Sequence, residues 1–261
     1  MRRLIISTAC VAFLLAAALA QAATFSNFEP PTYTAGTSFF GVDGWNTTFG
    51  GSTNRVTPDP AGTGITTVLD GLQSGAVSHG SIIRGWNGLQ SFVTNGLTIS
   101  WLMDRLDSFG VSAFYLFSDI PNGLTPAGIE WDGSGNIKMF GGPGSGVSFD
   151  TGFDYTTNKV FHMSMTFDFT AYTFSATAEN VTDSGPVWNL GTRPMANPVQ
   201  TIQFIQANGG LGLNSGSPSG SFTVFDDIQL QIPEVVPEPS ALLLLSLSGL
   251  LLRRRRKRTA E

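Results

Sequence analysis

The feature that most restricts the fold of this chain is an alternation of apolar and polar residues with a period of two. The alternation is clearest between residues 160 and 169. Its apolar members are Phe161, Met163, Met165, Phe167 and Phe169, and its polar members are His162, Ser164, Thr166 and Asp168. Successive side chains of a β-strand point to opposite faces, so this pattern predicts a strand with one buried face.

Similar short stretches recur along the chain, and no segment shows a sustained helical period. The predicted strands are Phe25–Glu29, Gly80–Arg84, Leu97–Leu106, Val111–Ser118, Gly128–Asp132, Ile137–Phe140, Val160–Phe169, Tyr172–Asn180, Val199–Gln206 and Phe222–Ile232. Glycine, proline and asparagine clusters separate many of them, for example at residues 121–123, 132–135 and 141–144. About ten short strands with such turns predict an all-β, antiparallel sandwich or barrel.

The N-terminus has the features of a secretory signal peptide. Arg2 and Arg3 precede an uncharged, mostly apolar run from Leu4 to Ala20, and small residues follow up to Ala22. A basic start, an apolar run and small residues at a cleavage site define such a peptide. We therefore expect residues 1–22 to be removed by signal peptidase. The only cysteine, Cys10, lies inside this run, so the mature protein is expected to contain no disulfide.

The C-terminus contains three consecutive features that together form a motif. Residues Val236, Pro237, Glu238 and Pro239 precede an apolar run at 241–252, which ends at a basic cluster. The basic cluster consists of Arg253, Arg254, Arg255, Arg256, Lys257 and Arg258. In this order the three parts resemble the PEP-CTERM sorting signal of exopolysaccharide-producing Gram-negative bacteria. We assign residues 233–261 to this tail.

The resemblance implies that an exosortase-like processing protease recognises the tail and cuts near the Pro-Glu-Pro motif. A basic cluster after an apolar segment is retained on the cytoplasmic side, which leaves the preceding domain outside the inner membrane. Twelve apolar residues in a helix span about 18 Å, which is short for a bilayer core and suits a transient tether. The expected destination is the cell surface or the extracellular matrix.

The charge of the predicted central domain argues against nucleic acid as a partner. Between residues 23 and 236 the chain has 17 acidic and six basic residues, a formal net charge of −11. Nucleic-acid-binding domains neutralise phosphates with clustered Lys and Arg, and these six basic residues are scattered. We therefore expect no nucleic-acid partner.

The central domain, residues 23–232, opens with residues 25–29 followed by Gly44 and Trp45, and it closes with the segment 225–230. These two ends resemble those of exported jelly-roll domains of the concanavalin A-like or carbohydrate-binding type. In such folds the first and last strands lie close together, and the resemblance implies a structural calcium ion there. Glu29, Asp226 and Asp227 are the expected ligands, since calcium prefers oxygen ligands.

The sequence offers little for catalysis. Glu130 and Asp132 would share one face of a strand, as in concanavalin-like glucanases, but the second glutamate of that motif is missing. We interpret Glu130 and Asp132 as the polar end of a strand that enters a turn. We assign no catalytic residue and expect that the protein is not an enzyme.

Sugar binding is the remaining function that the residues suggest. Trp86 lies between polar residues and glycines and is the candidate for a sugar contact. The sequence favours a non-catalytic surface or matrix component associated with exopolysaccharide. A carbohydrate-binding, lectin-like module with a defined sugar site is the alternative, and a secreted polysaccharide hydrolase is the second alternative.

Overall fold

In the computed structural model of the protein, the described residues are 22–47, 53–58, 60–61, 66–78, 80–85, 97–106, 110–117, 127–142, 147–195, 204–211 and 222–231. These residues form β-strands and no helix, and every strand pairing is antiparallel. The strands belong to two sheets, called sheet A and sheet B. The predicted all-β, antiparallel fold is therefore confirmed.

Sheet A has the strand order β13-β12-β11-β6-β15-β4-β3, with β1 also paired to β15. Its strands are β1 (Ala22–Ser26), β3 (Thr53–Thr57), β4 (Ser74–Ser78), β6 (Leu97–Arg105), β11 (Val160–Asp168), β12 (Thr173–Asn180), β13 (Val187–Pro194) and β15 (Phe222–Gln231). Sheet B has the order β10-β9-β8-β7-β14-β5-β2. Its strands are β2 (Trp45–Thr47), β5 (Gly80–Gly85), β7 (Val111–Phe117), β8 (Ala127–Trp131), β9 (Asn136–Gly141), β10 (Val147–Asp154) and β14 (Phe204–Leu211).

The order of the strands is that of a jelly roll. The chain passes between sheets A and B several times, and its last two strands insert between early ones: β14 lies between β5 and β7, and β15 lies between β4 and β6. Such insertion of late strands next to early ones is the Greek-key connection of jelly-roll sandwiches. The predicted meeting of the chain's first and last strands is also observed, because β1 pairs with β15.

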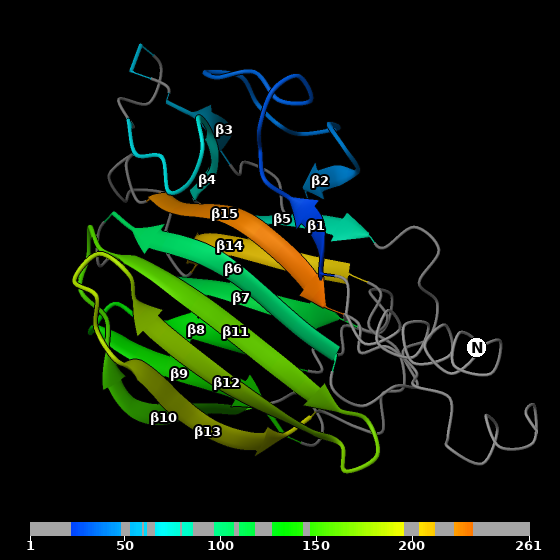
Figure 1. Ribbon diagram of the computed structural model, residues 1–261, viewed down its shortest axis with the longest axis vertical. Helices are drawn as coiled ribbons and strands as arrows, with labels where there is room; N and C mark the ends of the chain where they lie inside the picture. Colours follow the sequence, from blue (N-terminus) through cyan, green and yellow to red (C-terminus); the bar gives the residue numbers. More distant parts are fainter. Residues whose placement is uncertain are drawn as a thin grey trace, which may run out of the picture. The chain divides into compact units, whose positions relative to one another are not determined.

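The hydrophobic core lies between the two stacked sheets (Figure 1). Trp101 of β6 stacks on Phe114 of β7, with ring centroids 4.0 Å apart, and meets the edge of Trp131 of β8. Along β11 every second residue is buried, as its sequence pattern predicts. Burial of these large apolar side chains is the main source of stability for such a sandwich.

Several predicted strand boundaries were wrong, and five strands were not predicted. The first strand is Ala22–Ser26 rather than Phe25–Glu29, because the backbone leaves the extended conformation at Phe28, which has φ 54°. The strand predicted at Val199–Gln206 runs from Phe204 to Leu211. The unpredicted strands β2, β3, β4, β10 and β13 lack a clear apolar alternation in sequence.

Candidate functional site

The outer face of sheet B carries two aromatic rings next to one another. Tyr115 of β7 pairs with Gly128 of β8, and Gly128 pairs with Phe140 of β9. A Cβ atom at Gly128 would lie 2.2 Å from the Tyr115 ring, so the glycine provides the space that this ring occupies. The Tyr115 and Phe140 rings meet edge to face, with centroids 5.4 Å apart. We call these two half-buried rings the aromatic platform.

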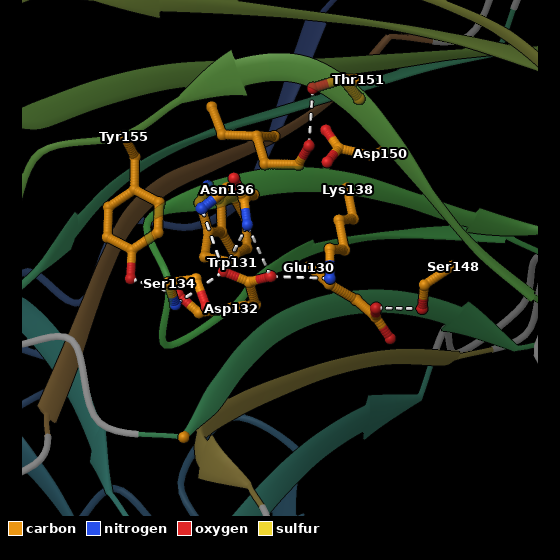
Figure 2. A network of polar contacts seen from close by, with 12 residues as sticks. Glu130, Trp131, Asp132, Ser134, Asn136, Lys138, Ser148, Asp150, Thr151 and Tyr155 are labelled. Carbon is orange, nitrogen blue, oxygen red and sulfur yellow. Dashed lines mark hydrogen bonds and ion pairs between the residues drawn. The ribbon is translucent and has the colours of Figure 1, made fainter.

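A buried carboxylate lies beside the platform. Glu130 is 9% exposed and accepts hydrogen bonds from the hydroxyls of Tyr115 and Ser148, one on each carboxylate oxygen. Burial, and then the charge of Glu130, raise the pKa of Tyr115 far above its ordinary value. Tyr115 therefore stays protonated and acts as a hydrogen-bond donor. Two hydroxyl donors hold Glu130 in one orientation, which Figure 2 shows for Ser148.

Asp132 has a different role from Glu130, although the two residues are only two positions apart. Its Oδ1 atom accepts from the backbone N–H groups of Ser134 and Asn136 at 2.8 and 3.0 Å, and its Oδ2 atom lies 2.7 Å from Lys138 Nζ (Figure 2). These donors hold the pKa of Asp132 well below its usual range, although burial alone would raise it. Asp132 caps the turn between β8 and β9, as the interpretation of a polar strand end predicts.

Charged groups of opposite sign follow one another across three strands next to the platform. Glu130 of β8 pairs with Lys138 of β9, and Lys138 pairs with Asp150 of β10. The pKa of Lys138 is raised, chiefly by its hydrogen bond to Asp132. An aromatic surface with a fixed carboxylate and an ammonium group beside it can hold a neutral polyhydroxyl ligand, by stacking and by hydrogen bonds.

The predicted calcium ligands lie near the junction of β15 with residues 69–74, but each carboxylate has protein donors. Glu29 Oε1 accepts from the N–H groups of Leu72 and Gln73, at 2.6 and 3.2 Å. Asp226 Oδ2 accepts from Ser74 Oγ at 2.7 Å and from Asp70 N at 3.2 Å.

The remaining ligand, Asp227, accepts from the side chain of Gln229. Among the described residues, no group of three or more His, Cys, Asp or Glu side chains is arranged to hold a metal ion. Calcium binding stays a prediction.

The tryptophans that the structure describes are packing residues. Trp45, Trp101 and Trp131 are fully buried, and Trp188 packs against the core beside Phe153. Trp86, the predicted sugar contact, lies outside the described residues. The aromatic platform was not predicted from the sequence. The available signal was Gly128 in a predicted strand, because a glycine in a strand often marks a place where another group approaches the backbone closely.

The two targeting segments also lie outside the described residues, including Val236–Pro239 and the basic cluster 253–258. Among the residues that are described, no helix is long and apolar enough to cross a bilayer. The predicted signal peptide and sorting tail therefore stay predictions.

No protein-family model matches this sequence, and no curated protein matches it. Solved structures with a similar chain path include a sialidase, with 14% identity and a TM-score of 0.45 over 77% of this chain. This match spans only 19% of the sialidase.

Two further matches span most of both chains. The catalytic domain of a glycoside hydrolase family 131 protein from Coprinopsis cinerea has 13% identity and a TM-score of 0.42, over 71% of this chain and 80% of its own. The lectin UEA-II, complexed with galactose, has 10% identity and a TM-score of 0.48, over 80% of this chain and 97% of its own. At such identities and TM-scores the similarity assigns neither a family nor a ligand to this chain.

Proposed function

We propose that the protein is an exported, non-catalytic component of the cell surface or extracellular matrix that binds polysaccharide through the outer face of sheet B. The observation that carries the proposal is the aromatic platform of Tyr115 and Phe140 beside Glu130 and Lys138. Sugars present apolar C–H faces and hydroxyls that both donate and accept. Rings, a carboxylate and an ammonium group complement all three properties.

The carboxylates of this face support binding rather than hydrolysis. A glycosidase needs a carboxylic acid with a raised pKa and a second, suitably placed carboxylate. The hydrogen bonds to Asp132 hold its pKa low, and its carboxylate is paired with Lys138. Both oxygens of Glu130 already accept hydrogen bonds from hydroxyls. The hydrogen bonds and the ion pair of Glu130 and Asp132 therefore favour a role in a fixed binding surface.

Replacing the platform tyrosine tests the proposal. Tyr115→Ala is expected to weaken binding to exopolysaccharide prepared from the host culture by about tenfold, because a ring contact of this kind contributes on the order of 1.4 kcal/mol. Affinity electrophoresis or equilibrium dialysis gives the dissociation constants.

The matched control is Tyr172→Ala, since Tyr172 is 37% exposed in the turn between β11 and β12, which are strands of sheet A. Equal affinities of wild type, Tyr115→Ala and Tyr172→Ala would contradict the proposed site. Shortening of the polymer by the wild-type protein would instead support the hydrolase alternative.

Export and sorting are the second part of the proposal, and they rest on the tail motif at residues 236–258. The mature protein, purified from the outer surface and the medium of its host, is expected to have lost residues 1–22 and everything after about Pro237. Intact mass and the C-terminal peptide measure this directly. A protein confined to the inner membrane that still ends at Glu261 would show a simple membrane tether and remove this part of the proposal.

A further inference from the structure

The outer face of sheet A differs in chemistry from that of sheet B. Side chains of β6, β11 and β12 that alternate with the core residues form its centre, and these side chains are partly exposed. In Figure 1 these three strands lie in front, and no described element crosses them. The face is therefore a broad sheet surface without a described cover.

Two successive rows of paired residues cross five strands of this face, β13, β12, β11, β6 and β15. In strand order, the first row is Thr192, Ser175, Thr166, Thr98 and Gln231. The second row is Asn189, Thr177, Ser164, Ser100 and Gln229. All ten side chains carry a hydroxyl or a carboxamide, and none is charged. We call these ten residues the neutral face.

The geometry of a sheet makes the neutral face a regular array. Neighbouring strands lie about 4.8 Å apart, and the two rows are separated by about 6.7 Å along the strands. The hydroxyls of Thr98 and Thr166 are hydrogen-bonded at 2.9 Å, which joins the two central strands within one row. Threonine has few χ1 rotamers, so its hydroxyl loses little freedom when a ligand binds.

The absence of charge on the neutral face indicates which kind of partner it fits. Hydroxyls and carboxamides both donate and accept hydrogen bonds, as sugar hydroxyls do. None of the ten side chains is itself charged, which lowers the cost of covering them with a neutral polymer. The carboxylate of Asp227 lies at the edge of the second row, where it accepts from the side-chain amide of Gln229. Asp168 lies beyond one row and Glu179 beyond the other, and both disfavour a polyanion in a domain that is already acidic.

We propose that the neutral face is a second docking surface for a neutral, hydroxyl-rich stretch of polysaccharide, so that one sandwich binds two polymer chains and cross-links them. The inference rests on the proposed function, because the first chain is the one bound at the platform on sheet B. The two outer faces lie on opposite sides of the core. One domain can therefore contact two chains without a second copy.

The test introduces charge at the centre of the neutral face. In the double variant Ser164→Glu/Thr166→Glu, docking would bury two unpaired carboxylates, while both side chains point away from the core. The matched control is Thr34→Glu/Thr156→Glu, which adds the same charge at two exposed loop positions. Far-UV circular dichroism and urea midpoints establish that both variants are folded.

Two binding measurements on the full mature protein separate the faces, with the same host exopolysaccharide as the probe. On a surface densely coated with the polymer, the double variant is expected to bind about 10²-fold more weakly than wild type and control, since two linked contacts become one. Short oligosaccharide fragments report on the Tyr115 platform alone. The affinity of the double variant for them is expected to stay within about twofold of the wild-type affinity, because the two sites are far apart. Light scattering of the soluble polymer should rise with wild type and control and not with the double variant.

Three other outcomes would contradict this inference, the proposed function or both. Cross-linking by the double variant at the wild-type level would overturn this inference and leave the platform proposal intact. A wild-type protein that binds neither surface nor fragments would overturn the proposed function, and this inference with it. Scattering that rises with protein alone, without polymer, would show that the neutral face binds a second copy of the chain and would also overturn the inference.

Discussion

Arg105→Ala is expected to lower the free energy of unfolding by about 3 kcal/mol or more, because it removes a buried guanidinium that joins several carbonyls. Arg105 ends β6 and is 1% exposed. Its Nη1 atom donates to the carbonyl oxygens of Trp131 and Asp132, and its Nη2 atom donates to that of Gly110 at 2.7 Å. The guanidinium also lies over the ring of Tyr155, 5.3 Å from its centroid.

The replacement leaves these carbonyls without the guanidinium and creates a cavity where sheet A meets the end of β8. Arg105→Lys should be nearly as destabilising, since a single ammonium cannot reproduce a fork that reaches three carbonyls. Urea unfolding with a common m-value measures the loss. Lys159→Ala is the control, because Lys159 pairs with the exposed Asp183 at the surface, and its midpoint is expected to match wild type. An Arg105→Ala midpoint equal to that of the control would contradict the expectation.

The sequence was most informative where one face of a strand is apolar and the other is polar. Residues 160–169 and 172–180 were predicted as strands, and β11 and β12 occupy 160–168 and 173–180. Strands β4 and β10 were missed, because glycine, serine and charged residues interrupt the apolar alternation that identifies a strand. Their strand conformation depends on pairing with β15, β3 and β9, and such pairings are not visible in the local sequence.

The candidate site was less predictable than the fold, because it depends on register across three strands. Tyr115, Gly128 and Phe140 are separated in sequence, and a shift of one residue in either pairing would place the rings on different faces. The sequence correctly marked Glu130 and Asp132 as neighbours on a strand end. Their different roles depend on their hydrogen-bond donors. Asp132 accepts from the adjacent turn at Ser134–Asn136, whereas Glu130 accepts from Ser148 of β10, a partner that the local sequence does not show.

The free energy of unfolding is expected to fall as the pH rises from about 4 to about 7, which is the opposite of ordinary acid denaturation. Burial raises the pKa of Asp226 to about 7, although the hydroxyl of Ser74 and two backbone N–H groups lower it. Burial also raises the pKa of Asp104 to about 6, and its Oδ1 atom has no hydrogen-bond partner. In the unfolded chain both carboxyls ionise near pH 3.8.

The sign follows from proton binding. Between pH 4 and 7 the folded protein holds protons that the unfolded chain releases, so raising the pH favours unfolding until both groups are ionised in each state. At about 1.4 kcal/mol per unit of pKa, Asp226 alone accounts for a loss of up to about 4 kcal/mol. Below pH 4 the free energy of unfolding is expected to fall as the pH is lowered. The hydrogen bonds to Asp132 hold its pKa below the ordinary value, so the folded state loses stability when this carboxylate becomes protonated.

Urea midpoints at pH 4.5, 6.0 and 7.5, at constant ionic strength and with a chelator, measure the slope. Asp226→Asn should remove most of it, because the amide does not ionise, whereas the exposed Asp183→Asn should leave it unchanged. A midpoint that rises with pH in wild type and in Asp226→Asn alike would contradict the expectation.

Repeating the series with calcium tests the predicted ion at Glu29, Asp226 and Asp227, since a bound cation favours ionised carboxylates and stabilises only the folded state. A midpoint at pH 7.5 that rises with calcium in wild type, but not in Asp226→Asn, would support that ion, and an unchanged midpoint would remove it.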